Sequence, residues 1–371
     1  MKQGLKRWLG NLAAFCVSLF IMLAAVEVGL RLFVPYATPI TIKDPHIYRR
    51  MRPNMEMDLE GKDWQSRIFT NEHGWMGPAF DIEKTPGTKR VLHIGDSLVE
   101  AIHVNTEKSF VSQLNNLLPG TEHLNLSVAG RGTLLEFLTY RYYGYSYDPD
   151  VTIIWFYTGN DFRDNYQNRH LVRKKDLETV TVEPQRLGAL KAYLLQNFRL
   201  PRFMFEKGKD NALFVGLLVK TGLLSIQPEE VGAEIPLGFR TTYLDTPERG
   251  EALKTTELLL QALKQEVTKG RLVLGVIPDI FDLRADLREQ MLKEYPALQG
   301  QDLDIDFARR ELTRIAREQH IPLLDLTEPF RRAFSQGKEP YLLIDGHLSQ
   351  EGHDITAIAV ATYLRGQKFL P

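Results

Sequence analysis

The chain has 371 residues, of which 43% are hydrophobic and 25% charged, a composition typical of globular proteins. Lys and Arg (46) nearly balance Asp and Glu (47), and the net charge of -1 gives no indication of nucleic-acid binding. The single cysteine, Cys16, excludes an intramolecular disulfide. The length is sufficient for one large core with a smaller appended unit.

The N-terminus contains an uncharged run, residues 8–26, preceded by Lys2, Lys6 and Arg7. A helix over this run nearly crosses a hydrocarbon core of roughly 30 Å at 1.5 Å per residue. The apolar character resumes after Glu27, so we expect contact with the lipid bilayer through residues 8–34. The basic flank predicts a cytoplasmic N-terminus.

These features predict a cytoplasmic tip and single-pass anchor over residues 1–34, in the cytoplasmic (inner) membrane of a bacterium. The rest of the chain would then lie in the periplasm or outside the cell. Glu27 and Arg31 are spaced to pair at i,i+4 near the outer interface. A cleaved signal peptide and a buried core helix are the alternative interpretations.

Residues 35–87 are interrupted by six prolines, which predicts a linker and an edge segment over the core. Within it, Asn71-Glu72-His73-Gly74 is typical of a turn.

From residue 88 to 371 the pattern alternates between short apolar runs and amphipathic segments. Strands are predicted at 90–95, 123–128, 151–157, 271–277 and 322–326. Helices are predicted near 108–118, 132–144, 247–269, 303–319 and 350–365. This alternation predicts an α/β fold with a central, doubly wound parallel sheet, whose sites lie beyond the carboxyl ends of the strands.

Residues 163–246 break the alternation. The stretch begins with basic residues and later contains an apolar run, residues 212–226, that is too short to span a bilayer. Two interpretations stay open here, a cap over the site and a peripheral helix pair with no role in binding.

Two short motifs carry the chemistry, and the first is Gly95-Asp96-Ser97 directly after a predicted strand. A serine at a strand-to-helix turn lies near helical N–H groups that stabilise a developing anion. The motif differs from the Gly-x-Ser-x-Gly elbow, because Val99 occupies the place of the second glycine. The alternative role of Ser97 is a plain helix N-cap.

The second motif is Asp345-Gly346-His347, just before the last predicted helix. Side chains two residues apart can meet across an extended turn, where the carboxylate fixes the imidazole tautomer and the imidazole serves as a base. The alternative is an Asp cap beside a surface His. His353, inside the helix, is expected to pack or face solvent.

Two further positions follow predicted strands. Gly130 ends the stretch Ser127-Val128-Ala129-Gly130, and a glycine lets its N–H approach a substrate oxygen closely. Asn160, in Gly159-Asn160-Asp161, can supply a side-chain donor to the same oxyanion. The alternative for Asn160 is a simple β-turn.

In this order, Ser97, Gly130, Asn160 and His347 resemble the blocks of the SGNH/GDSL hydrolase superfamily. The matching stretches are Ile94-Gly95-Asp96-Ser97, Ser127-Val128-Ala129-Gly130, Thr158-Gly159-Asn160-Asp161 and Ile344-Asp345-Gly346-His347-Leu348-Ser349. The resemblance covers roughly residues 88–368 and implies a flavodoxin-like three-layer αβα fold. The N-terminal part resembles membrane-anchored bacterial members of the superfamily through Glu27, Leu30-Arg31-Leu32-Phe33, Asn71, Gly74, Trp75 and Gly77.

The resemblance implies a role for each site residue. Ser97 would be the nucleophile, His347 the general base and Asp345 its orienting acid. The backbone N–H groups of Ser97 and Gly130 and the side chain of Asn160 would form the oxyanion hole. Many members place the acid three residues before the base, whereas Asp345 lies two before His347, a spacing similar to that of the polysaccharide-acetylation branch.

The expected function is a membrane-anchored, extracytoplasmic serine esterase that cleaves small acyl esters, by resemblance O-acetyl groups on a saccharide. It would need no metal and no cofactor. The alternatives are an O-acyltransferase of envelope or exopolysaccharide modification with the same triad, and a catalytically silent scaffold. A metal hydrolase using Asp345, His347 and His353 is disfavoured, because these residues lack the i,i+4 histidine spacing of a helical zinc site.

Overall fold

The structure of the protein is a computed structural model, and it describes residues 2–33, 40–172, 193–194, 197–208, 234–367 and 369. The chain divides into two compact units. The first combines residues 1–39 with 183–227, and the second combines residues 40–182 with 228–371. Each unit is described by itself.

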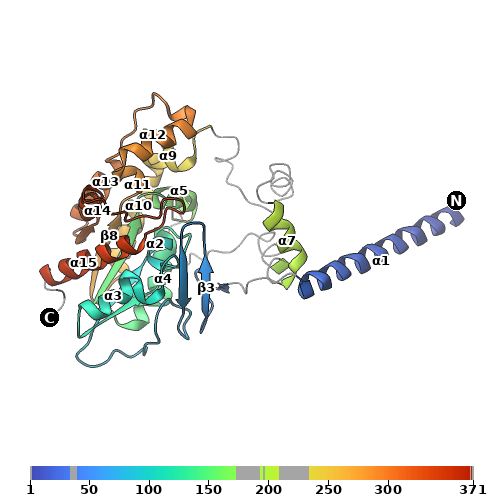
Figure 1. The fold of residues 1–371 in the computed structure, drawn as a ribbon, viewed down its shortest axis with the longest axis horizontal. Coiled ribbons are helices and arrows are strands. Elements are labelled where there is room, and N and C mark those ends of the chain that lie inside the picture. Colours follow the sequence, from blue (N-terminus) through green and yellow to red (C-terminus); the bar gives the residue numbers. More distant parts are fainter. Residues whose placement is uncertain are drawn as a thin grey trace. The chain divides into compact units, whose positions relative to one another are not determined.

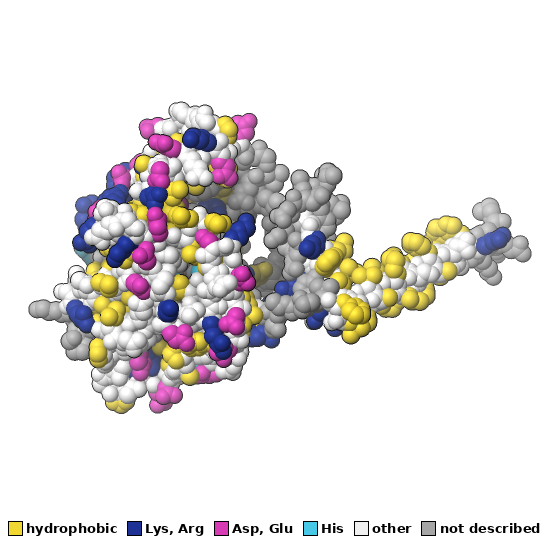
Figure 2. Space-filling view, in the orientation of Figure 1, with side chains coloured by type: hydrophobic (Ala, Val, Ile, Leu, Met, Phe, Trp, Pro, Cys, Tyr) yellow, Lys and Arg dark blue, Asp and Glu magenta, His cyan; other side chains and the backbone are white. Residues whose placement is uncertain are grey.

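The first unit contains helices α1 (Lys2–Phe33) and α7 (Arg199–Gly208), which contact each other. Over Arg7–Phe33, α1 is long and apolar enough to cross a membrane, with a mean hydropathy of 2.3. Figure 2 shows hydrophobic side chains along the length of this helix. The predicted pair is present, with Arg31 Nε 2.7 Å from Glu27 Oε1.

The second unit is built on a five-stranded parallel sheet (Figure 1). Its strands are β5 (Lys89–Ile94), β6 (Thr121–Asn125), β7 (Val151–Tyr157), β8 (Arg271–Ile277) and β9 (Leu323–Asp325). They run in the order β6-β5-β7-β8-β9, which is the flavodoxin-like arrangement. The predicted fold class is confirmed, and each expected strand is present within three residues of its predicted ends.

Side chains alternate between two apolar layers because successive residues of a strand point to opposite faces. Leu92, Ile154 and Leu274 pack on one face and Val91, Ile153 and Val273 on the other, all buried. Strands covered on both faces must be apolar throughout, which explains their short, almost uninterrupted hydrophobic runs.

Helices cover both faces of the sheet (Figure 1). The face of Leu92 is covered mainly by α4 (Thr133–Tyr142), α5 (Asp161–Val172), α10 (Pro247–Glu266) and α13 (Phe307–Glu318). The face of Val91 is covered by α3 (Phe110–Leu117), α14 (Thr327–Ser335) and α15 (Gln350–Gly366). Further helices of this unit are α2 (Ser97–Glu100), α9 (Leu237–Thr242), α11 (Ile280–Leu283) and α12 (Ala285–Glu294).

The segment expected as a linker contains two antiparallel hairpins. The first pairs β1 (Thr41–Asp44) with β2 (Tyr48–Met51), and the second pairs β3 (Glu56–Glu60) with β4 (Gln65–Phe69). The turn predicted at Asn71 is confirmed, because Gly74 N donates to Asn71 O at 3.0 Å. Trp75, just after it, is buried in the core of the second unit.

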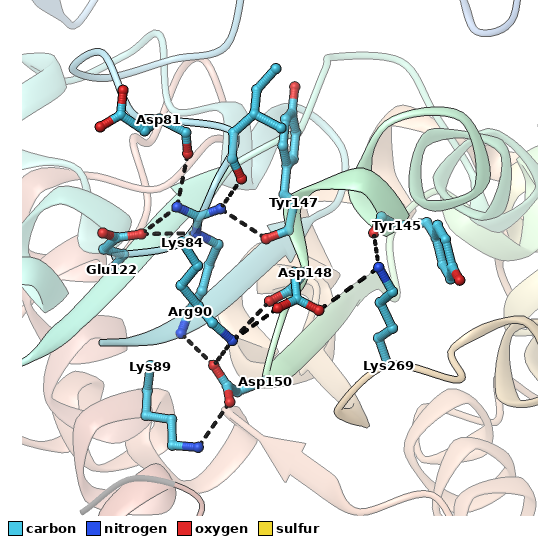
Figure 3. A network of polar contacts seen from close by, with 11 residues as sticks. Asp81, Lys84, Lys89, Arg90, Glu122, Tyr145, Tyr147, Asp148, Asp150 and Lys269 are labelled. Atoms are coloured by element: carbon cyan, nitrogen blue, oxygen red, sulfur yellow. Dashed lines mark hydrogen bonds and ion pairs between the residues drawn. The ribbon is translucent and has the colours of Figure 1, made fainter. Parts of the chain in front are cut away.

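A polar network fastens this segment to the amino-terminal edge of the sheet (Figure 3). The fully buried guanidinium of Arg90 donates to the backbone carbonyls of Asp81, Ile82 and Tyr147 and pairs with Glu122. Nearby, Asp150 accepts from Lys84 and Lys89 at 2.9 Å each. The network lies at the start of β5, at the opposite end of that strand from Ser97.

The predicted insertion at 163–246 is divided between the two units. Its first part lies in α5 and its last part in α9, both in the second unit, whereas α7 belongs to the first. The apolar run at 212–226 lies outside the described residues, so the choice between a cap and a peripheral helix pair stays open.

Candidate active site

The candidate site lies at the carboxyl ends of the central strands, where parallel α/β sheets place their ligands. Ser97 follows β5, Gly130 follows the extended stretch after β6, and Asn160 follows β7. His347 precedes α15. All four of these residues therefore come from connections that leave the same edge of the sheet.

Ser97 is the first residue of α2, directly after the turn that ends β5. The turn needs a glycine, since a Cβ on Gly95 would lie 2.8 Å from Val99 Cγ2 and 2.9 Å from Trp155 Cβ. Asp96 caps the helix by accepting from Leu98 N at 2.9 Å. The serine side chain is consequently held at the beginning of a helix and is half-buried.

The structure brings Ser97, His347 and Asp345 together. His347 Nε2 lies 2.8 Å from Ser97 Oγ, and His347 Nδ1 is hydrogen-bonded to Asp345 Oδ1. With the proton on Nδ1, the imidazole can accept the serine proton at Nε2. The two-residue spacing read from the sequence thus allows the Asp345 carboxylate to contact the His347 ring.

A tight loop holds the Asp345–His347 pair. Leu342 N donates to His347 O at 2.8 Å, and Gly346 N donates to Leu342 O at 2.9 Å. Gly346 has a φ of +83°, a conformation that L side chains rarely adopt. The glycine therefore allows the chain to reverse so closely that two side chains two residues apart meet.

Gly130 also has a positive φ, of +68°, and lies close to the serine turn. Val128 N donates to Gly95 O at 3.2 Å, so the stretch that ends in Gly130 runs alongside the turn before Ser97. Arg49, from the first hairpin, donates to Ala129 O at 2.8 Å. The peptide that carries the Gly130 N–H is thereby held by contacts of the two residues before it.

Glu100 lies buried behind this loop. Burial raises the pKa of its carboxyl to about 7, although a hydrogen bond from the backbone of Ala129 and the charges of Arg49 and Arg131 oppose the shift. A carboxyl group that titrates near neutral pH therefore contacts the backbone next to Gly130.

Asn160 is tied to the serine turn through Asp96. Its Nδ2 donates to Asp96 Oδ2 at 3.1 Å, which leaves one amide N–H unassigned. Burial raises the pKa of Asp96 to about 6, while hydrogen bonds from Leu98 N and Asn160 act against the shift. The same carboxylate thus orients both α2 and the asparagine.

Two residues at the site were not found from the sequence, Trp64 and His103. The indole of Trp64 donates from Nε1 to Asp345 Oδ2 at 3.0 Å, and His103 Nε2 lies 3.3 Å from Asp345 Oδ1. The rings of His103 and His347 are stacked, with centroids 3.8 Å apart and planes inclined by 18°. In addition, Asp63 accepts from Ile344 N at 2.8 Å, which ties the β3–β4 turn to the loop.

Three side chains of the site could hold a metal ion by type and position. The ligand atoms of His103, Asp345 and His347 all lie within 4.8 Å of one another. His353 is not among them, since it is buried in α15, where its Nδ1 accepts from Phe110 N at 3.4 Å. The metal alternative based on the sequence therefore used the wrong second histidine.

The arrangement is suited to nucleophilic attack by an oxygen. The base is in contact with the hydroxyl it would deprotonate, and its other nitrogen faces a carboxylate. The sequence predicts the N–H groups of Ser97 and Gly130 and the side chain of Asn160 as donors to a developing oxyanion, and the structure shows Asn160 hydrogen-bonded to Asp96, next to the serine.

Comparisons with known proteins give similarities of fold. No protein-family model and no curated protein matches the sequence. Among solved structures, the alpha/beta hydrolase enzyme LAE5 from the metagenome of Lake Arreo, Spain, is 13% identical, with 78% of this chain and 99% of that chain covered and a TM-score of 0.41. A catalytic mutant of the acetylxylan esterase Axe2 from Geobacillus stearothermophilus is 13% identical (76% and 95% covered, TM-score 0.39). A member of the lipolytic protein G-D-S-L family from Veillonella parvula is also 13% identical (74% and 97% covered, TM-score 0.38).

Proposed function

We propose that this protein is a serine esterase of the SGNH/GDSL type, which hydrolyses small acyl esters through an acyl-serine intermediate. The observation that carries the proposal is the continuous line of contacts from Ser97 Oγ through His347 to Asp345. A serine hydroxyl is a weak nucleophile unless a base removes its proton, and this line supplies the base and its orienting acid.

In the acylation half-reaction, Ser97 Oγ attacks the ester carbonyl carbon while its proton passes to His347 Nε2. The carbonyl oxygen becomes an oxyanion, which the N–H groups of Ser97, Gly130 and Asn160 stabilise. The tetrahedral intermediate then collapses, the bond from carbon to the alcohol oxygen breaks, and His347 gives the proton to the leaving alcohol.

In the second half-reaction, water takes the place of the alcohol. His347 removes a proton from the water, the hydroxide attacks the acyl-serine, and the acid leaves as Ser97 Oγ recovers its proton. Asp345 stabilises the imidazolium in both halves without itself becoming protonated. Every step uses groups of the chain, the ester and water.

The proposed substrate is an O-acetyl group on a surface or secreted saccharide, because the two-residue spacing of Asp345 and His347 resembles that of the polysaccharide-acetylation branch. We propose further that α1 anchors the protein in the bacterial inner membrane with the second unit on the outer side. The length, hydropathy and basic flank of α1 support this orientation.

The test is hydrolysis of p-nitrophenyl acetate by the full chain in detergent, wild type beside Ser97→Ala. Ser335→Ala is the matched control, because Ser335 is exposed and its hydroxyl donates only to Arg332 O. Turnover that is lost with Ser97→Ala and kept in the control supports the proposal. Release of acetate from an acetylated polysaccharide then tests the substrate class.

The remaining outcomes separate the alternatives. Acylation of Ser97 without turnover would indicate an acyltransferase that requires its saccharide acceptor. Absence of acylation in a folded protein would contradict the esterase proposal and favour a silent scaffold.

A further inference from the structure

Asp345 is more exposed than the acid of a catalytic triad usually is, since its side chain keeps 27% of its accessible surface. It lies in a tight turn, outside any helix or strand. A short carboxylate at such a position needs other side chains to fix its direction. Two side chains approach it from elsewhere in the chain, the indole of Trp64 and the imidazole of His103.

The two side chains approach different oxygens of the carboxylate. Trp64 Nε1 reaches Oδ2 at 3.0 Å, while His103 Nε2 approaches Oδ1, the oxygen that also bonds His347. Burial alone would raise the pKa of Asp345, but hydrogen bonds from Trp64 and His347 hold it below its usual range. The carboxylate is thus ionised and bound at both oxygens.

His103 differs from His347 in its surroundings. Its side chain is only 7% exposed, and burial, together with the adjacent His347, lowers its pKa to about 4. It is therefore neutral at ordinary pH, and its Nε2 makes a polar contact of 3.3 Å with Asp345 Oδ1, which a proton on that nitrogen would strengthen. Its ring also occupies one face of His347 at 3.8 Å, which restricts rotation of the catalytic imidazole.

Trp64 and His103 support one another as well. Their rings meet edge to face with centroids 4.7 Å apart, a favoured geometry for aromatic pairs. Trp64 comes from the turn between β3 and β4, which Asp63 fastens to Ile344 N. The second hairpin consequently forms part of the site.

We propose that Trp64 and His103 are positioning residues of the active site, which hold Asp345 and, through it, the tautomer and orientation of His347. The proposal rests on the proposed serine chemistry and adds two residues to it. Neither side chain needs to touch the substrate.

The variants separate the two contributions of each ring. Trp64→Phe removes the donor to Asp345 and keeps an aromatic ring. His103→Phe likewise keeps the stack on His347, whereas His103→Gln keeps a donor and loses the stack. Trp75→Phe is the matched control, because it removes another indole donor, 3.0 Å from Tyr147 Oη, away from the triad.

The measurement is the rate at which a fluorophosphonate probe labels Ser97, recorded against pH in the full chain. We expect Trp64→Phe and His103→Phe each to slow labelling by about tenfold, the size of one hydrogen bond to a charged group. In these two variants the acid limb of the profile should move to higher pH. The Asp345 carboxylate, having lost a polar contact, would stabilise the protonated form of His347 more strongly. His103→Gln should keep the limb of the wild type.

If Trp64→Phe and His103→Phe are labelled at the rate of the wild type and with the same pH profile, the positioning roles are overturned. If His103→Phe does not fold, Trp64→Phe and His103→Gln still decide the question. A wild type that is not labelled at all would instead contradict the proposed function, so the two failures are distinguishable.

A second inference rests on a different observation, the joint between α1 and α7 in the first unit. Glu27 Oε1 accepts from Arg199 N at 3.0 Å and Glu27 Oε2 accepts from Leu200 N at 2.9 Å, so a side chain of α1 caps the first turn of α7. In return, Arg199 Nη1 donates to Leu30 O and Arg31 O at 3.2 Å, near the last turn of α1.

The joint lies near the end of the apolar span Arg7–Phe33, where a membrane helix would emerge from the bilayer. One face of α7 carries Leu200, Phe203 and Met204 at i, i+3 and i+4, and Met204 is 52% exposed. Phe198, just before α7, is 40% exposed. These apolar side chains therefore continue the exposed apolar surface of α1.

We infer that α7 is an interfacial helix, held by Glu27 at the membrane surface where α1 emerges, with its Leu200–Met204 face against the lipid. Amphipathic helices of this kind bury the apolar face at the boundary between headgroups and acyl chains. The apolar face of α7 is thus covered by the bilayer itself. This inference does not depend on the candidate active site in the second unit.

The test uses spin labels on the full chain in vesicles of phosphatidylethanolamine and phosphatidylglycerol. Cys16, the single cysteine, reports on α1, and Met204→Cys and Lys338→Cys in a Cys16→Ser background report on α7 and on an exposed control position. Spin labels at residues 16 and 204 should collide more often with oxygen, which dissolves in lipid, than with a water-soluble nickel chelate. The label at residue 338 should show the reverse. Adding Glu27→Ala should reduce the oxygen preference at 204.

If the label at residue 204 behaves like the label at residue 338 while the label at Cys16 lies in hydrocarbon, this inference is overturned. If 16 is also in water, the proposed anchoring by α1 is wrong instead.

Discussion

Ser97 and His347 are 250 residues apart in the chain, yet Oγ of the serine and Nε2 of the histidine are separated by 2.8 Å. The serine is fixed by the end of β5 and the histidine by the loop before α15, and α15 packs on α3 beside β5. The contact is therefore a product of the sheet and its covering helices.

His347→Ala should lower the acetyl-esterase rate by about 10²–10⁴-fold, the usual contribution of a positioned base. Because His347 keeps 26% of its surface, imidazole added to the solution should enter the gap and restore part of the rate. The measurement is p-nitrophenyl acetate turnover against imidazole concentration. His170→Ala, at an exposed histidine, is the control, and equal rates in the two variants would exclude His347 as the base.

Asn160→Ala should lower kcat by about 10²–10³-fold, with a smaller effect on KM, because one oxyanion donor acts mainly in the transition state. Asn168→Ala provides the control, since Asn168 lies on α5, the helix that follows Asn160, and donates to Asp164 O. Steady-state kinetics of the two variants test the assignment, and an unchanged kcat in Asn160→Ala would remove this residue from the oxyanion hole.

Gly130→Ala should lower kcat by about 10–100-fold, because the added Cβ would lie 3.1 Å from Arg49 Nη2 and displace the amide. Gly87→Ala is a close control, having a φ of +85° and no atom within 4 Å of the added Cβ. Both variants should lose about 1–2 kcal/mol of unfolding free energy to backbone strain. If kcat falls equally in both, strain alone would explain the effect.

Glu100→Gln should stabilise the protein in a manner that depends on pH. Burial raises the pKa of Glu100 from 4.5 to about 7, so the folded wild type binds a proton that the unfolded chain releases in this range. The wild type therefore loses stability as pH rises from about 4.5 through 7, and the variant does not.

The difference in unfolding free energy between Glu100→Gln and wild type should thus be larger at pH 8 than at pH 5, by an amount of order 3 kcal/mol. Urea denaturation at the two pH values measures it. Glu107→Gln, at an exposed glutamate, should show no such difference. A difference for Glu100→Gln that is equal at both pH values would contradict the assigned shift.

Arg90→Met should destabilise the second unit without changing the chemistry. The substitution leaves Glu122 and three buried or half-buried carbonyls without their donor, at a cost of about 3–5 kcal/mol. Arg271→Met, at an exposed position at the start of β8, should cost less than about 1 kcal/mol. Urea denaturation and kcat of the folded fraction check both parts, and a lower kcat with Arg90→Met would connect this network to the site.

The sequence was sufficient for the central sheet of the second unit, because the strands of this sheet are buried on both faces and helices lie between them in the chain. Runs such as Val151–Tyr157 therefore stand out without any alignment. The candidate site positions were predicted for a related reason, since Ser97 and Asn160 follow such runs within three residues. The prediction of the sheet and of these two positions therefore rested on the hydrophobic pattern and on location at the ends of strands.

Trp64 and His103 could not be found in this way. Trp64 lies 281 residues from Asp345, in a segment whose prolines suggested irregular structure. The available signal was weak: two five-residue runs, Glu56–Glu60 and Gln65–Phe69, flank a turn that contains Gly61 and Asp63. A hairpin was predictable from that pattern, but its position over the Asp345 loop depends on tertiary packing.

The separation of Ser97 from His347 also has a consequence for biosynthesis. At roughly 5–20 residues per second, the ribosome makes Ser97 about 10–50 seconds before His347. During that interval the growing chain already contains the serine, its glycine turn and the asparagine. It lacks His347, so under the proposed mechanism a chain released before residue 347 carries the serine without its base.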